Sequence, residues 1–231
     1  MSDRPLVAVV VFPGSNDDRD AAGALEATGA ESELVWHDES ELPTGTGAIV
    51  LPGGFSYGDY LRTGAMASLA PAMDAVRRFA NDGGPVLGIC NGFQILCESR
   101  LLPGVLRPNR QLEFVSRDVR IHVENTDTVF TRLCTAEQQL VIPIKHGEGA
   151  WYADEETFVQ LAARNQIVLR YDEDVNGSLG NVAGVINERG NVMGLMPHPE
   201  HAVDPLLGSS DGGLLLEALV DAAAQHSLAR T

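Results

Sequence analysis

Cys90 stands between two glycines, and this spacing is the feature of the chain with the clearest chemical meaning. The apolar run 86–89 stops at the cysteine, and helix-like apolar spacing begins just after it. Gly88 and Gly92 match the G-x-S-x-G nucleophile elbow with cysteine in place of serine, a turn so tight that its neighbours must be small. The turn presents the thiol at a helix N-terminus, where the helix dipole and free N–H groups stabilise a thiolate. The pattern therefore predicts a nucleophile rather than an ordinary buried cysteine.

A thiol nucleophile needs a base, and the base needs a third group that orients it. A Pro-His-Pro-Glu segment near the C-terminus offers both, because His198 and Glu200 point the same way if the loop is extended. His146 and Glu148 have the same spacing after another predicted strand. His201 is a third histidine beside the first pair. Spacing alone leaves both His-x-Glu pairs open.

A Pro-Gly-Gly-Phe segment containing Gly53, Gly54 and Phe55 also follows a predicted strand. Acyl transfer through a cysteine needs N–H donors for the developing oxyanion, each worth about 10²–10³ in rate. The N–H of Asn91, directly after the cysteine, is one candidate. The glycine loop can supply the other, because glycine lets the backbone approach a substrate closely.

The elements that must position these residues alternate between strand and helix along the chain. This alternation predicts an α/β fold, a flavodoxin-like and mostly parallel sheet with helices on both faces. Two middle strands alternate apolar and polar residues, which indicates antiparallel additions. In such a fold the chemistry lies outside the carboxyl ends of the strands, where all three segments fall. Strands are expected at 6–12, 32–36, 48–51, 86–89, 114–123, 140–144, 182–187 and 191–196, and helices at 17–28, 71–81, 213–226 and directly after the elbow.

Length and composition limit the class of protein. A chain of 231 residues, 44% hydrophobic, can bury one good core, and without a linker or repeat we predict a single domain over residues 1–231. Three cysteines without paired spacing argue against a disulfide framework or a zinc site, so no metal is expected. No segment approaches the ~20 apolar residues of a membrane span, and the run 6–12 is short for a signal peptide. We expect a cytoplasmic protein with no membrane partner.

The charge balance is unusual, with a formal net charge of −16 and Lys145 as the single lysine. Nucleic acid is excluded as a direct ligand because its binding needs a basic surface. One hypothesis for the acidic, lysine-poor surface is a salty cytoplasm, where screening removes repulsion between carboxylates; a generic acidic surface is the alternative. Walker A and G-x-G-x-x-G motifs are both missing. We therefore expect no cofactor in this chain, and any ATP-driven step should belong to a partner.

The motifs taken together resemble a known family. Residues 88–94, Gly-Ile-Cys-Asn-Gly-Phe-Gln, with His-Pro-Glu at 198–200, resemble the class I, triad-type glutamine amidotransferases and their fold. Further segments resemble, in combination, the family of glutaminase subunits of phosphoribosylformylglycinamidine synthase, and the resemblance covers nearly the whole chain. These segments are Pro-Gly-Ser-Asn at 13–16, Pro-Gly-Gly-Phe-Ser-Tyr-Gly-Asp at 52–59, Pro-Ile-Lys-His-Gly-Glu-Gly at 143–149 and Met-Pro-His-Pro-Glu at 196–200.

The resemblance implies a mechanism that uses the residues already singled out. Cys90 would attack the side-chain amide of L-glutamine, form a γ-glutamyl thioester and release ammonia. His198, oriented by Glu200, would protonate the leaving ammonia and then activate water. The backbone N–H groups of Gly54 and Asn91 would stabilise both tetrahedral intermediates. Because His-Pro-Glu is the class signature, the resemblance favours this histidine over its rival.

The resemblance also implies partners. Gln94 would help to hold the substrate, and His146 and Glu148 would line the site or an interface. The ammonia would pass to a large synthetase subunit, which uses ATP and Mg to convert formylglycinamide ribonucleotide to the amidine in purine biosynthesis. A small third subunit completes the complex. Residues 55–62, polar and aromatic together, are the candidate contact with a partner.

Three other interpretations remain at this point. The chain could be the glutaminase of another class I system, such as one that makes GMP or pyridoxal phosphate. It could be a cysteine peptidase-like hydrolase on a similar sheet. It could also be a binding subunit that kept the fold and lost activity, although the intact Cys90, His198 and Glu200 argue against this.

Overall fold

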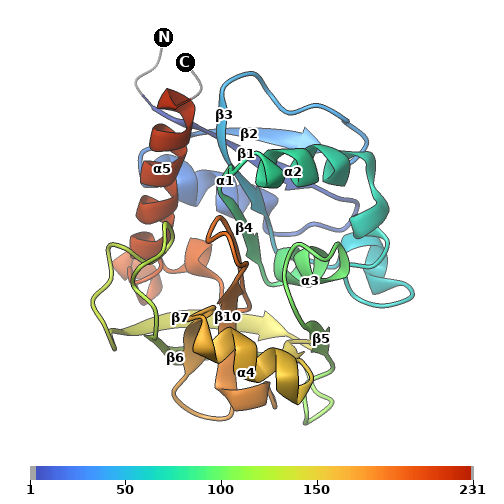
Figure 1. Cartoon of the computed structure of the whole chain (residues 1–231), viewed down its shortest axis with the longest axis vertical. Coiled ribbons are helices and arrows are strands. Elements are labelled where there is room, and N and C mark those ends of the chain that lie inside the picture. Colours follow the sequence, from blue (N-terminus) through green and yellow to red (C-terminus); the bar gives the residue numbers. More distant parts are fainter. Residues whose placement is uncertain (1–3, 230–231) are drawn as a thin grey trace.

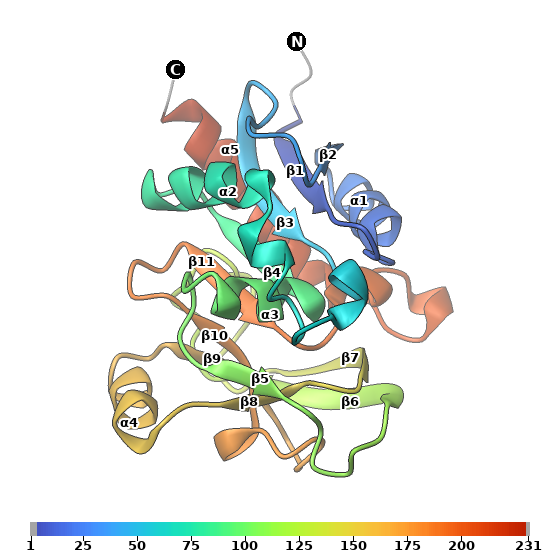
Figure 2. The ribbon, with the colours of Figure 1, turned by 90° about the vertical axis from the view of Figure 1, so that its right-hand side faces the viewer.

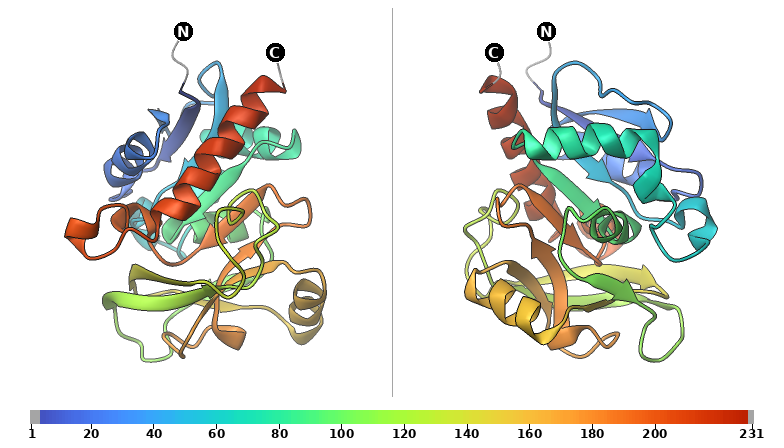
Figure 3. Two further views of the ribbon diagram at one scale, coloured as in Figure 1. Left: turned by 90° about the vertical axis from the view of Figure 1, so that its left-hand side faces the viewer. Right: turned by 45° about the vertical axis from the view of Figure 1, so that its right-hand side comes forward.

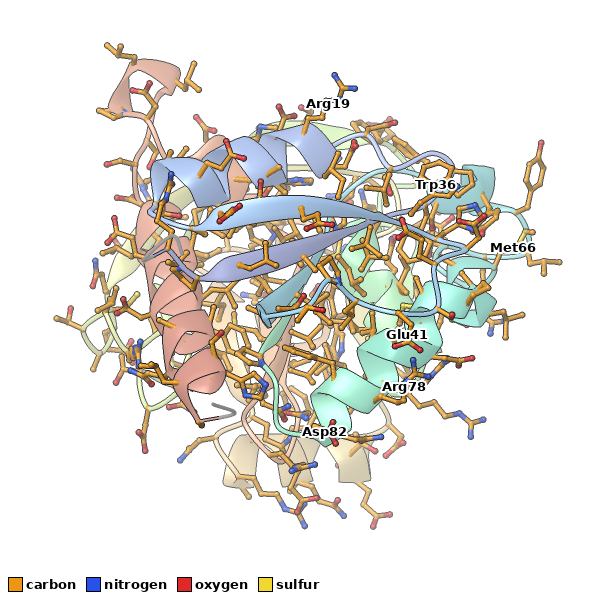
Figure 4. The ribbon with its side chains drawn as sticks, turned by 90° about the horizontal axis from the view of Figure 1, so that it is seen from above. Arg19, Trp36, Glu41, Met66, Arg78 and Asp82 are labelled. Carbon is orange, nitrogen blue, oxygen red and sulfur yellow. The ribbon has the colours of Figure 1, made fainter. Side chains whose placement is uncertain are left out.

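The computed structural model describes residues 4–229, and a nine-stranded mixed sheet forms its centre (Figure 1). One half of the sheet is parallel, and all its strands except the edge strand are mostly buried apolar runs because both faces are covered. This half consists of β1 (Leu6–Val11), β2 (Glu31–Trp36), β3 (Thr46–Leu51), β4 (Val86–Ile89) and β11 (Val192–Leu195). The exposed strand β2 forms one edge, and Figure 4 shows its Trp36 at the outside of the molecule.

The other half of the sheet is antiparallel and occupies the lower part of Figure 2. It consists of β6 (Val115–Val123), β7 (Gln139–His146), β9 (Ile167–Tyr171) and β10 (Val182–Ile186). The order across the whole sheet is β2-β1-β3-β4-β11-β10-β9-β6-β7. A separate two-stranded sheet joins β5 (Val105–Arg107) to β8 (Ala150–Tyr152).

Helices cover both faces of the parallel half (Figure 3). On one face α1 (Asp18–Ala27) packs on β1 and β2, and α5 (Gly213–Leu228) packs on β3. On the other face lie α2 (Pro71–Asn81) and α3 (Asn91–Glu98), the latter against β4 and β11. A further helix, α4 (Glu155–Ala163), lies beside the antiparallel half. Short 3-10 helices are η1 (Ser56–Asp59), η2 (Ala67–Leu69), η3 (Leu179–Asn181), η4 (Pro199–His201) and η5 (Pro205–Leu207).

The expected α/β architecture, with helices on both faces and antiparallel additions, is confirmed. The bounds predicted for 71–81 and 86–89 are those of α2 and β4, and residues 188–190 connect the antiparallel strands β10 and β11. The sequence did not predict β5, β8, β9 or α4, so the antiparallel part is larger than expected.

The core is built from the strands and the inward faces of the helices. Phe12, Ile49, Leu87 and Phe93 are among its fully buried side chains. The outward face of α2 is charged; Figure 4 shows Arg78 beside Glu41 in the loop before β3. Within residues 4–229, none of the helices has the length and apolar character that a membrane span requires.

Candidate active site

The nucleophile elbow predicted around Cys90 forms the junction of β4 and α3 (Figure 2). Cys90 has φ 50° and ψ −104°, a strained conformation that costs a non-glycine residue about 1–3 kcal/mol. A Cβ on Gly92 would lie 1.9 Å from the carbonyl oxygen of Leu51. One on Gly88 would lie 2.5 Å from Cδ1 of Leu96. The turn therefore requires both glycines, as the sequence predicted.

Cys90 is 5% exposed and lines a cavity of about 310 Å³. The walls come from the loops after β1, β3, β4 and β11 and from the end of β7, so the cavity lies at the carboxyl ends of the parallel strands. A larger open groove of about 1020 Å³ lies at the opposite end, beside Leu6, Glu31 and Thr46, where three of the strands begin. That groove contains none of the predicted site residues.

His198 and Glu200 form a buried pair, with His198 Nδ1 2.6 Å from Glu200 Oε1. A carboxylate can only accept a hydrogen bond, so Nδ1 carries the proton. The other ring nitrogen, Nε2, is buried and has no hydrogen-bond partner among residues 4–229. Burial alone would lower the pKa of His198, but Glu200 and then Cys90 raise it, to about 10. The imidazole is therefore protonated at neutral pH, where its charge can stabilise a thiolate.

The side chains of the other His-x-Glu pair, His146 and Glu148, have separate partners. His146 Nδ1 lies 2.9 Å from the side-chain oxygen of Asn109, and Glu148 Oε2 lies 3.4 Å from Thr63 Oγ1. Burial and then the charge of His198 lower the pKa of His146 to about 4, so this imidazole is neutral at pH 7. Both members of the rival pair line the cavity, as expected from the resemblance, but neither orients the other.

Two backbone N–H groups beside the thiol, those of Gly54 and Asn91, donate to no group within residues 4–229. The loop around Gly54 pairs with the segment after β1. The hydrogen bond there is donated by the next residue, since Phe55 N donates to Gly14 O at 2.8 Å, and the N–H of Gly54 takes no part in it. Gly54 has φ +139°, which favours glycine strongly. Both predicted oxyanion donors are thus unpaired and border the elbow.

The other predicted binding residues build the wall and the mouth of the cavity. Gln94 is buried rather than solvent-facing: its Nε2 donates to Glu148 O at 2.6 Å, and its Oε1 accepts from Asn91 Nδ2 at 2.8 Å. Phe55 is exposed and its ring centroid lies 6.3 Å from that of Phe114. Contact of Gln94 and Phe55 with a substrate stays a prediction.

A buried carboxylate next to the triad, that of Asp17, was not predicted from the sequence. Asp17 Oδ2 lies 3.7 Å from His198 Nδ1, and Asp17 Oδ1 accepts a hydrogen bond from Lys145 Nζ. Gly53 makes room for this contact, because a Cβ there would lie 2.4 Å from Asp17 Oδ2 and 2.7 Å from His198 Cε1. Asp17 stands at the start of α1, where its type indicates only a helix cap. The one signal in the sequence that could have pointed to a buried carboxylate was Lys145, the single lysine of an acidic chain.

Asp17, His198, Glu200 and His201 bring potential metal-ligand atoms within 4.8 Å of one another. Imidazole and carboxylate together suit a divalent cation. The ammonium of Lys145 already neutralises Asp17, however, and Glu200 accepts the Nδ1–H that a metal would have to replace. We interpret the group as a hydrogen-bonded network.

A second pair of carboxyl groups faces the cavity away from this network. Burial and then the charge of Glu148 raise the pKa of Asp59 to about 6. Asp59 Oδ1 is buried and has no hydrogen-bond partner among the described residues. This end of the cavity can therefore accept a cationic group.

Comparison with known proteins agrees with this geometry. Residues 4–211 match the family model of the CobB/CobQ-like glutamine amidotransferase domain. Phosphoribosylformylglycinamidine synthase subunit PurQ of Rhodopseudomonas palustris (strain BisB18) is 52% identical over 224 residues, which are 93% of this chain and 96% of that protein. The protein of the same name from Rubrobacter xylanophilus is 54% identical over 217 residues, covering 94% of this chain and 98% of that one.

A solved structure extends the likeness to three dimensions. The structure of PurLQS from Thermotoga maritima contains a chain that is 44% identical and superposes with a TM-score of 0.87, over 94% of this chain and 98% of that one. These matches separate the family from the other amidotransferase systems that the motifs left open. The chain belongs to the CobB/CobQ-like glutamine amidotransferases and, among them, to the PurQ subunits of phosphoribosylformylglycinamidine synthase.

Proposed function

We propose that this chain is a glutaminase that hydrolyses L-glutamine through a thioester on Cys90 and supplies the ammonia for the synthesis of phosphoribosylformylglycinamidine. The observation that carries the proposal is one cavity lined by the elbow cysteine, an oriented imidazole and Gly54. The N–H groups of Gly54 and of Asn91, the residue after the cysteine, donate to no group among the described residues. These parts suit acyl transfer from an amide.

The proposed reaction has two halves. The sulfur of Cys90 attacks the side-chain carbonyl carbon of glutamine, and the N–H groups of Gly54 and Asn91 bind the oxyanion. The C–N bond breaks as His198 gives its proton to the leaving nitrogen, which departs as ammonia. The neutral imidazole then takes a proton from water, and the resulting hydroxide attacks the thioester and releases glutamate. The thiolate and the imidazolium are restored together.

The shape and charge of the cavity support an amino-acid substrate. Its volume of about 310 Å³ suits a small molecule rather than a folded peptide segment. Asp59 and Glu148 would accept the α-ammonium group of glutamine, whose amide would then lie toward Cys90. Burial of the ammonium between two carboxyl groups would keep Asp59 ionised in the complex, since an opposite charge lowers a carboxyl pKa.

The proposed partners are a large ATP-dependent synthetase subunit and a small third subunit, with ATP and Mg bound by the synthetase and no cofactor in this chain. The family's name and the solved assembly called PurLQS support a complex of this kind. Residues 55–62 remain the candidate contact, since Tyr60 is 73% and Leu61 89% exposed. We place the activity in the cytoplasm, where a reducing environment keeps free cysteines such as those of this chain in the thiol form.

The test is intact-mass analysis after incubation with a glutamine analogue that carries an electrophile at the amide position. The protein should gain one label, and Cys90→Ser should gain none. Cys97 and Cys134 serve as internal controls, because burial raises the pKa of both thiols, that of Cys134 to about 11. Labelling of these cysteines in place of Cys90, or no labelling at all, would contradict the proposal.

A further inference from the structure

The single lysine of the chain lies inside the active-site cavity rather than on the acidic surface. Lys145 is the second-last residue of strand β7, directly before His146, and its Nζ donates to Asp17 Oδ1. The backbone carbonyl oxygen of the same lysine lies 3.8 Å from Cys90 Sγ. One residue thus reaches both the nucleophile and the carboxylate beside the base.

Asp17 is turned away from its own helix. It occupies the N-cap position of α1, where an aspartate side chain usually accepts from the first N–H groups of the helix, yet it makes no such hydrogen bond. Its Oδ2 lies 3.7 Å from His198 Nδ1, and its Oδ1 lies 3.4 Å from His201 Nε2. The side chain of Asp17 therefore does not stabilise the start of α1 and contacts His198 and His201 in its place.

A second carboxylate at the base has an electrostatic consequence. Glu200 alone already satisfies the Nδ1–H of His198 at 2.6 Å. Asp17, 3.7 Å away, is too distant for a hydrogen bond to this nitrogen but close enough for a strong charge interaction. Burial would raise the pKa of Asp17, yet hydrogen bonds from His201 and Lys145 and the charge of His198 hold it well below its usual range. The carboxylate is thus ionised beside the imidazole.

We propose that Asp17 and Lys145 form a positioning pair for the catalytic imidazole of His198, in which Asp17 stabilises the imidazolium and Lys145 limits that effect. The inference rests on the proposed function, because it concerns the same histidine. The two charges act in opposition. Asp17 favours the protonated imidazole that must donate to ammonia, and Lys145 offsets enough of this field for the imidazole to become a base in the second half of the reaction.

Other charged groups also face His198 and must be held constant. Glu200 and His201 approach from η4, with the ring of His201 5.4 Å from that of His198. Cys90 approaches from the elbow, and His146 from β7 carries no charge at neutral pH because its pKa is lowered to about 4. Substitution at Asp17 or Lys145 leaves these residues in place, and among them only His201 loses a contact, the one at 3.4 Å to Asp17 Oδ1.

The test is an NMR titration of the ¹⁵N-labelled imidazole of His198 in a full-length Cys90→Ser background, which removes the thiolate charge and needs no activity. Asp17→Asn should move the midpoint downward by about one pH unit or more, because it removes an anion within 4–6 Å of the ring and leaves the lysine charge uncompensated. Lys145→Gln should move the midpoint upward. The double variant should return toward the starting value, since both charges are gone.

Asp18→Asn is the matched control, because it removes the same charge from the first turn of α1 without a contact to His198 among the described residues. Its midpoint should stay unchanged. A purely structural role for the pair predicts equal midpoints in all variants, and that result would overturn the proposal, as would shifts in one common direction. Lys145 is partly exposed, so Lys145→Gln keeps the test valid if Asp17→Asn does not fold.

Labelling of Cys90 by the glutamine-directed electrophile separates this inference from the proposed function. If the wild-type chain is labelled but the midpoints do not move in opposite directions, only the positioning pair is wrong. If the wild-type chain is not labelled, the glutaminase proposal itself fails. In the labelled case, the midpoint of the basic limb of the labelling rate should follow the NMR midpoints across the variants.

Discussion

His198 must give a proton in the first half of the reaction and take one in the second. Glu200 at 2.6 Å fixes the Nδ1–H tautomer and leaves Nε2 for the nucleophile and the leaving group. The raised pKa of His198, about 10, makes the imidazolium the resting form. His198 can take a proton in the second half because Cys90 is then acylated. The thiolate charge that helps to raise the pKa of His198 is absent in that state.

Substitution of the two candidate histidines separates their roles. His198→Ala should lower glutaminase turnover by about 10²–10⁴-fold, the usual contribution of a general acid–base. His146→Ala should retain much more activity, because its imidazole is neutral and has no carboxylate partner among the described residues. Turnover of each variant is measured in the assembled complex with its synthetase partner. The reverse ranking would contradict the assignment.

The pH dependence of Cys90 labelling follows from the sign of the shift at His198. A raised pKa means that the imidazolium persists from acidic pH up to about 10. With an electrophile whose leaving group must take a proton from His198, the labelling rate should hold across neutral pH and fall as pH rises through about 10. Glu200→Gln removes the largest raising interaction, and the fall should then begin at lower pH. An unchanged basic limb in Glu200→Gln would show that Glu200 does not act on this imidazole.

Much of the site could be predicted at the residue scale, and one part could not. The order Gly-x-Cys-x-Gly requires a particular backbone turn, so Cys90, Gly92 and the N–H of Asn91 follow from sequence alone. Asp17 does not, because an aspartate at a helix start has the same appearance whether its side chain caps the helix or turns toward a histidine. The direction of that side chain depends on Lys145, which is 128 positions away.

The junction of β4 and α3 holds the nucleophile by close packing against β3. Gly92 touches the end of β3 so tightly that its absent Cβ would overlap the carbonyl oxygen of Leu51 at 1.9 Å. Backbone cannot yield as a flexible side chain can, so the elbow and the strand fix each other's position. Strand β4 pairs in parallel with β3 on one side and with β11 on the other. The loop that carries His198 follows β11.

Gly92→Ala should therefore destabilise the protein by about 1–3 kcal/mol or more, the usual cost of overpacking a buried site. Gly23→Ala is the matched control, since a Cβ there meets no atom within 4 Å on the exposed face of α1. The control should gain about 0.5–1 kcal/mol, because alanine is the better helix former. Free energies of unfolding from urea titration measure both. Equal stabilities of the two variants would contradict this account of the elbow.

Elements were predictable where their patterns were long and regular. The periodic spacing over 71–81 gave the bounds of α2, and alternation over 114–123 indicated β6. The helix α4 was missed because Leu161 is its one buried residue, so it has almost no apolar stripe. Strand β9 is a short apolar run that a buried helix could equally contain, and β5 and β8 are three residues each.

At the scale of the whole molecule, the net charge is −16, and among the described acidic residues only Asp17 and Glu200 are buried, so most of the charge lies at the surface. Several ion pairs there are exposed, including Arg164–Glu188 at 2.9 Å and Arg117–Glu173 at 2.9 Å. Exposed pairs of this kind are each worth about 0–1 kcal/mol and do not offset the repulsion among the remaining carboxylates. The acidic surface is thus a cost to folding that depends on the surrounding salt.

Salt should therefore stabilise the chain. Screening at molar KCl shortens the Debye length to about 3 Å and removes most of the repulsion, so the Tm should rise from dilute buffer to molar KCl. Sucrose at equal osmolality is the control for a general solute effect. Equal Tm values in dilute buffer and in molar KCl would contradict the screening hypothesis.

The most direct test of the central claim is to trap the acyl enzyme. The assembled complex is mixed with isotopically labelled glutamine, quenched in acid during turnover and analysed by intact mass and peptide mapping. We predict one glutamyl group in thioester linkage on Cys90, lost on treatment with hydroxylamine. Turnover of glutamine with no such adduct, or with the adduct on another residue, would show that the elbow thiol is not the nucleophile.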